Sequence, residues 1–127
     1  MNFFSRLIFL LNKPKVILVV GDSRKAVKEA IYQTLKSYFR RGEILFLDAD
    51  LKDKKKFEEF EFLARKTSLF VLVISRLHDS SEERKNIEEF VKTLPFQSRF
   101  VLNFNDQQLR EIESKADLER MTFGFEE

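Results

Sequence analysis

The sequence predicts one α/β domain over residues 1–127, in which a mostly parallel sheet of about five strands is covered by helices on both faces. The main observation is that apolar runs of strand length alternate, almost without interruption, with segments of helical periodicity. Three of these runs are continuous and rich in Val, Leu, Ile and Phe, as expected for strands covered on both sides. A β-α-β-α-β-α-β-α-β order indicates parallel strands joined by right-handed crossovers, and therefore a three-layer domain.

Five segments are predicted to be strands. They are Lys15–Val20, Glu43–Ala49, Leu69–Ser75, Arg99–Phe104 and, with a weaker pattern, Glu119–Phe123. Only 3 Gly and 2 Pro interrupt the chain, so the connections are expected to be short, and nothing marks a linker or a repeat. In open parallel sheets ligands bind beyond the carboxyl ends of the strands. The segments at that edge are Gly21–Lys25, Asp48–Lys52, Ser75–Ser80 and Asn103–Asp106.

Four helices are predicted between the strands, each from apolar residues spaced three or four positions apart. The first has Val27, Ala30, Ile31, Thr34, Leu35 and Tyr38 on one stripe. The second, from Asp53 to about Lys66, buries Phe57, Phe60 and Leu63 or Ala64. The third opens with Ser80-Ser81-Glu82-Glu83, a capping-box pattern, and carries Ile87, Phe90, Val91 and Leu94. The fourth starts near Asn105 or Asp106 and shows Leu109, Ile112 and Ala116.

Residues 1–13 are predicted to form a further, amphipathic helix. Its apolar face consists of Phe3, Phe4, Leu7, Ile8 and Leu11. The apolar stretch is far shorter than the roughly 20 residues of a membrane-spanning helix, and no signal-peptide cleavage site follows it. The simplest interpretation is a helix that packs on the domain, and the alternative is a helix that docks on a membrane surface or a partner. Phe62, which lies off its own helix's stripe, either joins an exposed patch with Phe3 and Phe4 or is covered by a neighbouring segment.

The composition limits the classes of function. Hydrophobic residues at 43% and charged residues at 35% describe a soluble globular protein, and a net charge of +2 does not favour nucleic acid as a partner. The absence of Cys excludes disulfides, thiolate catalysis and cysteine zinc sites, and suits a cytoplasmic protein. With a single His and no Cys, a Ser-His-Asp or Cys-His arrangement is also excluded. The one histidine, His78, is expected to be an exposed loop residue.

The stretch Val16–Leu35, VILVVGDSRKAVKEAIYQTL, has the outline of a phosphate-binding loop between a strand and a helix. Such a loop needs glycines whose amides face the anion, a lysine, and a Ser or Thr directly after it to hold Mg²⁺. Gly21 and Lys25 fit this pattern. Arg24, however, stands where the second glycine would be, and Ala26 where the hydroxyl would be.

Two further residues of this loop favour a simple turn. Asp22 would place a negative charge beside a bound anion, and Asp22 or Ser23 is a good helix N-cap. The loop is therefore predicted to be a capped strand-to-helix turn, with ATP, ADP or phosphate binding as the alternative. Asp48 and Asp50 end the second strand at the same edge and suit Mg²⁺, but solvated acids and helix capping are the simpler interpretation, so no metal site is predicted.

Two parts of the chain resemble the central ATPase domain of the Mur ligases, especially the type that adds the terminal dipeptide to the peptidoglycan precursor. The sequence KPKVILVVGDSRKAVKEAIYQTLKSYF resembles that family's strand, phosphate loop and Lys-Glu-Ala-like helix. The sequence FVLNFNDQQLREIESKADLERMTFGFEE is similar to the end of the same domain, with its Asn-x-Asp-Asp-like turn and TFG sequence. The resemblance implies a P-loop or Rossmann-like fold, a bacterial cytoplasmic protein and ATP as cofactor. Carried over residue by residue, it gives a candidate nucleotide site of Gly21, Asp22, Ser23, Arg24, Lys25, Asn103 and Asp106.

The departures from this family affect its chemistry. Arg24 and Ala26 replace the loop glycine and threonine, and Asn105 replaces the first aspartate of the turn. The strand that ends in a magnesium-binding glutamate in the family ends here in Ile74-Ser75-Arg76. The family's substrate-binding first domain and amino-acid-binding last domain have no counterpart in these 127 residues.

From these departures we expect a non-catalytic, pseudoenzyme-like module that acts by binding a protein partner or by self-association. It would have no catalytic residue and no metal. One alternative is a nucleotide- or phosphate-binding protein that uses the degenerate loop, and another is one domain of a split ligase in peptidoglycan precursor synthesis. Contact of the N-terminal helix with a membrane surface is the less favoured partner interaction.

Overall fold

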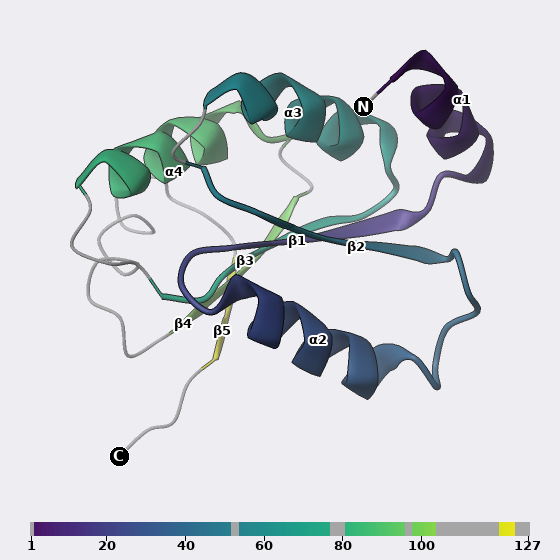
Figure 1. Ribbon diagram of the computed structural model, residues 1–127, viewed down its shortest axis with the longest axis horizontal. Helices are drawn as coiled ribbons and strands as arrows, with labels where there is room; N and C mark the ends of the chain where they lie inside the picture. The colour runs from purple at the N-terminus through teal and green to yellow at the C-terminus, as the bar shows by residue number, and fades with distance from the viewer. Residues whose placement is uncertain (1, 52–53, 77–80, 96–97, 104–119, 124–127) are drawn as a thin grey trace.

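The computed structural model describes residues 2–51, 54–76, 81–95, 98–103 and 120–123, and shows an α/β fold in which helices alternate with parallel strands (Figure 1). In chain order the elements are α1 (Phe3–Asn12), β1 (Lys15–Val20), α2 (Arg24–Leu35), β2 (Ile44–Ala49), the 3-10 helix η1 (Lys54–Lys56), α3 (Phe57–Lys66), β3 (Phe70–Ile74), α4 (Ser81–Thr93), β4 (Arg99–Asn103) and β5 (Arg120–Phe123). The strands form one sheet in the order β2-β1-β3-β4-β5, and each neighbouring pair is parallel. The predicted α/β class and parallel sheet are confirmed, and the arrangement is Rossmann-like.

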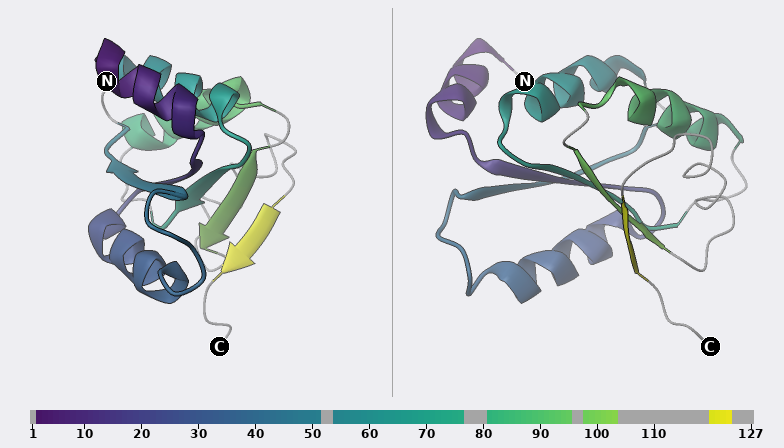
Figure 2. Two further views of the ribbon diagram at one scale, coloured as in Figure 1. Left: turned by 90° about the vertical axis from the view of Figure 1, so that its right-hand side faces the viewer. Right: turned by 180° about the vertical axis from the view of Figure 1, so that it is seen from behind.

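The sheet separates two apolar cores. Alternate residues of β1 point to opposite faces, so Val16, Leu18 and Val20 enter the larger core while Ile17 and Val19 enter the smaller one. Figures 1 and 2 show α1, α3 and α4 on the larger core's face and α2 on the other. Because β1 is covered on both sides, its sequence is a continuous apolar run instead of an alternating one.

The helices of the larger core follow the predicted stripes. In α3 and α4 the buried apolar residues are Phe57, Phe60, Leu63, Ala64, Ile87, Phe90 and Val91, while Leu94 is partly buried. The Phe90 ring lies 5.4 Å from that of Phe57 and 6.4 Å from that of Phe60, centroid to centroid. These aromatic contacts join α3 to α4 above the sheet.

The stripe predicted for α2 is partly wrong. Val27, Ile31 and Leu35 pack on the smaller core, but Ala30 and Thr34 are exposed. Tyr38 lies beyond the end of the helix and is 76% exposed. Because the helix ends at Leu35, its periodicity does not extend to Tyr38, and Tyr38 is not placed on the sheet.

Helix α1 packs on the domain through one side only. Phe9 is buried and its ring lies 6.3 Å from that of Phe62, while the Arg6 guanidinium lies 4.8 Å from the centre of the Phe62 ring. Phe62 is therefore covered by α1 and does not join an exposed patch. The helix begins where the Asn2 Oδ1 accepts a hydrogen bond from the Ser5 amide at 2.8 Å, and it ends at Lys13, whose φ of 43° is left-handed.

The predicted apolar face of α1 exists, but it points away from the domain. All five predicted members are exposed, and so is Leu10, which was not predicted. The outer face of α1 is the name used here for Phe3, Phe4, Leu7, Ile8, Leu10 and Leu11. Within the described ranges, none of the helices has both the length and the hydropathy needed to cross a bilayer. The helix predicted near Asn105 and the Ser80 cap lie outside the described residues.

Candidate functional site

The loop after β1 lies at the point where the strand order reverses. Since β2 pairs with one side of β1 and β3 with the other, the carboxyl ends of β1 and β3 form the switch point at which ligands bind in this topology. Gly21 and Ser23 both have left-handed backbone, with φ of 96° and 56°. A Cβ on Gly21 would lie 2.6 Å from the Arg76 carbonyl oxygen, so only glycine fits there without movement.

Hydrogen bonds join this loop to the end of β3. The Asp22 amide donates to the Arg76 carbonyl at 2.5 Å, and the Ser75 amide donates to the Val20 carbonyl at 3.1 Å. The buried Ser75 hydroxyl donates to the carbonyl of Asp22 and lies 3.2 Å from that of Val20. The switch point is therefore filled by backbone and a hydroxyl of the chain itself, and the Asp22 amide is already paired.

Two cations of α2 converge on Asp48, at the carboxyl end of β2. The Lys28 Nζ lies 2.5 Å from the Asp48 Oδ2, and the Arg24 Nε lies 3.8 Å from the Oδ1. The hydrogen bond from Lys28 is the main reason that the pKa of Asp48 lies below its ordinary value of 3.8. Burial of the carboxylate raises this pKa, but the charges of Lys28, Lys25 and Arg24 lower it further. Arg24 and Lys28 are one helical turn apart, so the carboxylate of Asp48 is their counter-ion.

The structure brings together most, but not all, of the predicted nucleotide site. Gly21, Asp22, Ser23, Arg24 and Lys25 form the β1–α2 loop and the first turn of α2. Asn103 ends β4, and nothing of its side chain is described, while Asp106 and His78 lie outside the described residues. Among the described residues, no group of three or more His, Cys, Asp or Glu side chains is placed to hold a metal ion.

The predicted capping of α2 by the Ser23 side chain is wrong. Ser23 occupies the N-cap position, but within the described part of the chain its hydroxyl makes no capping hydrogen bond. The cause is its left-handed backbone, with φ 56° and ψ 24°, because a capping side chain needs the extended conformation. Arg76 is exposed, and its backbone carbonyl accepts the hydrogen bond from the Asp22 amide at the switch point.

Two contributors to this site were not identified from the sequence. Lys28 pairs with Asp48. Its spacing of four residues from Arg24 is visible in the sequence, but the pairing of β1 with β2, which brings Asp48 to this helix, is not. The sequence places Ser75 at the end of a strand, at the ligand-facing edge and in the position of a metal ligand, but does not indicate a hydrogen-bonding role. Its actual role, a hydrogen bond to Asp22, depends on the neighbourhood of β1 and β3.

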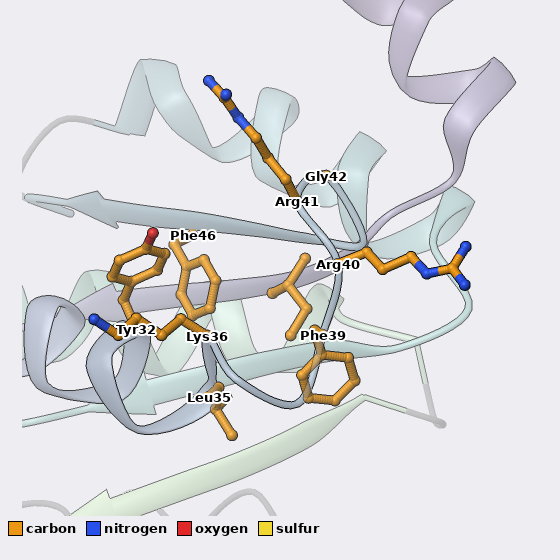
Figure 3. Close-up of a pocket in the computed structure, with 9 residues that line it drawn as sticks. Tyr32, Leu35, Lys36, Phe39, Arg40, Arg41, Gly42 and Phe46 are labelled. Atoms are coloured by element: carbon orange, nitrogen blue, oxygen red, sulfur yellow. The ribbon is translucent and has the colours of Figure 1, made fainter.

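Pockets also lie at the other end of the strands, around the α2–β2 loop. One of about 460 Å³ has an apolar floor with Tyr32, Phe39 and Phe46, and its rim includes Arg40 and Arg41, whose guanidinium groups extend away from the hollow (Figure 3). The Tyr32 and Phe46 rings meet edge to face at 5.5 Å. A second, of about 470 Å³, is lined by Asn12, Lys13, Pro14, Lys15, Arg40, Arg41, Gly42 and Glu43.

Comparison of the chain with protein-family models and with curated proteins finds no match. The resemblance to the Mur ligase central domain therefore stays a prediction.

Proposed function

We propose that this chain is a non-catalytic docking module built on a P-loop-like frame whose nucleotide site is closed. The observation that carries the proposal is the contact between the β1–α2 loop and β3. The Arg76 carbonyl oxygen accepts from the Asp22 amide and lies only 2.6 Å from where a Cβ on Gly21 would be. A phosphate loop needs such amides free and turned toward the anion, and here one of them is committed to the protein.

The charges of the loop support the same proposal. Arg24 and Lys28 have a carboxylate partner in Asp48, so a phosphate approaching them would compete with a counter-ion already in place. Ala26 offers no hydroxyl for Mg²⁺. In this proposal the chain is a degenerate relative of the Mur ligase central domain that has kept the strand–loop–helix frame and lost the magnesium–nucleotide chemistry.

Isothermal titration with Mg-ATP and with ADP tests this proposal. We expect no saturable heat at nucleotide concentrations up to about 1 mM. A Kd of about 1 mM corresponds to about 4 kcal/mol of binding free energy. Release of phosphate from ATP by the purified chain, or saturable binding at micromolar concentration, would overthrow it.

A second candidate function is binding of phosphate or ADP without a metal, at the start of α2. The observation that favours it is that Ser23 makes no capping bond to the described residues, while Lys25 is exposed beside it. Thermal unfolding with ADP and with inorganic phosphate distinguishes the two. A rise in Tm that is lost in Lys25→Ala and kept in Lys36→Ala, an exposed lysine at the other end of α2, would favour this candidate.

A further inference from the structure

Helix α1 packs on the domain with its apolar side exposed to solvent. The buried Phe9 and the stacking of Arg6 on Phe62 fix the opposite side of the helix against α3. On the outer face of α1, Phe3 is 80% exposed and Leu11 76%. Exposed apolar residues are ordinary when scattered, but a contiguous group on one helix marks a surface that binds something.

Positive charge lies directly beside this face. Lys13, Lys15, Arg40 and Arg41 line one pocket with Gly42, and this group is called here the basic rim. Glu43 is the one carboxylate among the described residues that line that pocket, and its Oε1 accepts a hydrogen bond from the Arg40 amide at 3.2 Å. Since the whole chain has a net charge of only +2, the basic rim holds a local excess of positive charge.

The basic rim and the outer face of α1 belong to one end of the molecule. Ser5, Ile8 and Asn12 of α1 line a smaller pocket together with Gly42, which places the helix against the α2–β2 loop. Figure 2, left, in which this end faces the viewer, shows α1 and that loop both on the near side. An apolar helix face and a group of cations are therefore presented together.

We infer that this end of the molecule binds the surface of an anionic lipid bilayer. The inference rests on the proposed docking function and names the partner. A helix that exposes an apolar face lies in the plane of a membrane interface, with that face at the acyl boundary and neighbouring cations on the headgroups. The charge decides between partners, because two copies of this chain meeting at this end about a two-fold axis would bring basic rim against basic rim.

Vesicle co-sedimentation of the full chain tests the inference. The probes are vesicles of phosphatidylcholine with phosphatidylglycerol and vesicles of phosphatidylcholine alone. We expect binding to the anionic vesicles, weaker binding to the neutral ones, and a loss of the difference between about 0.1 M and about 1 M NaCl, as the Debye length falls from about 10 Å to about 3 Å.

Matched variants locate the binding surface. Arg40→Gln with Arg41→Gln should lower the partition coefficient about thirtyfold, whereas Lys85→Gln with Lys92→Gln, which removes the same charge from exposed positions on α4, should leave it within about twofold. Leu7→Ser with Leu11→Ser should lower it at least about tenfold. Circular dichroism checks that each variant is folded.

Three outcomes would overturn the inference. The first is no binding to anionic vesicles, and the second is equal losses in the α1, rim and α4 variants. The third is a dimer in analytical ultracentrifugation that Leu7→Ser with Leu11→Ser dissociates, since it assigns the face to a second copy. That last result would leave the docking function standing, whereas nucleotide turnover would remove the docking function and leave vesicle binding to be judged on its own.

Discussion

Gly21 and Gly42 have similar left-handed backbone, with φ of 96° and 88°, but different surroundings. A Cβ on Gly21 would meet the Arg76 carbonyl oxygen at 2.6 Å and the Ser75 Oγ at 3.1 Å, whereas one on Gly42 would meet no described atom within 4 Å. We expect Gly21→Ala to lower the free energy of unfolding by about 3 to 4 kcal/mol, because it adds a backbone clash to the strain of positive φ. Urea unfolding followed by circular dichroism measures it.

Gly42→Ala is the matched control for that experiment. It carries the positive-φ strain without the clash, so we expect a loss of about 1 kcal/mol. The difference between the two variants isolates the close approach of the β1–α2 loop to the end of β3. Equal losses would mean that this approach is not tight, and the closed switch point would lose its main support.

Asp48 should make stability depend on pH at the acid end. Its hydrogen bond to Lys28 lowers its pKa below 3.8, so the folded state binds the proton more weakly than the unfolded state. The stabilisation is fully present above about pH 4 and is lost as the pH falls through the folded-state pKa. We expect Asp48→Asn to cost about 1 kcal/mol at neutral pH, since the pair is partly exposed, and the cost to disappear as the pH falls through the lowered folded-state pKa of Asp48.

Urea unfolding of both proteins across that pH range measures the effect. Lys28→Met should remove most of the same pH dependence, because it removes the main cause of the lowered pKa. A difference between the wild type and Asp48→Asn that stays constant from neutral to acid pH would contradict the assignment.

For single residues, the sequence identifies Gly21 as a turn residue but does not show which contact requires a glycine there. A glycine after an apolar run is recognisable as a strand-to-helix turn. The Ser75 hydroxyl and the Val20 carbonyl are 55 positions apart in the chain, and they meet only because β1 and β3 are neighbours. Local patterns contain no information about such a contact, so the closing of the switch point could not be predicted.

The elements themselves follow from the sequence wherever burial is complete. β1 was predicted with its bounds of Lys15–Val20, and β3 within one residue at each end, because both strands are covered on two faces and read as unbroken apolar runs. α2 was predicted less well. The smaller core lies on its side of the sheet, and only three residues of α2 pack on that core. Ala30 and Thr34 have the spacing of buried residues and were assigned to the buried stripe, but they are exposed.

Helix α1 should respond differently to changes on its two sides. Phe9 is 4% exposed and packs on Phe62, so we expect Phe9→Ala to cost about 3 kcal/mol, either globally or as local release of the helix. Leu11→Ala should change stability by less than about 0.5 kcal/mol, because Leu11 is 76% exposed. Urea unfolding gives the global values, and hydrogen exchange of residues 3–12 detects release of α1. Similar costs for the two variants would show that the outer face is packed against something within the chain.

The order of the strands belongs to the whole molecule and was not predicted. Alternation of strands and helices fixes parallel pairing and right-handed crossovers, but each new strand can be added at either edge of the sheet. Here β2 is placed on one side of β1 and β3 on the other, which creates the switch point. The sequence therefore predicted that a site would lie at the carboxyl ends of the strands, but not which two loops would meet there.

The same topology separates the two ends of the molecule. The switch point follows β1, whereas the Lys15 amide, at the start of β1, donates to the Glu43 carbonyl beside the basic rim. Six strand residues place these ends roughly 17 Å to 20 Å apart, beyond the distance at which substitutions usually interact. A surface that docks at one end should thus be energetically independent of the closed loop at the other.

A double-variant cycle tests this independence. Arg40→Gln with Arg41→Gln should leave the free energy of unfolding within about 0.5 kcal/mol of the wild type, since both side chains are exposed. Adding Gly21→Ala should produce the loss of that variant alone, with a coupling below about 0.5 kcal/mol. Gly21→Ala should also bind anionic vesicles like the wild type at a temperature where it is folded. A coupling above about 1 kcal/mol, with altered vesicle binding, would mean that the sheet transmits a change from one end to the other, and the closed loop would then be part of the docking mechanism.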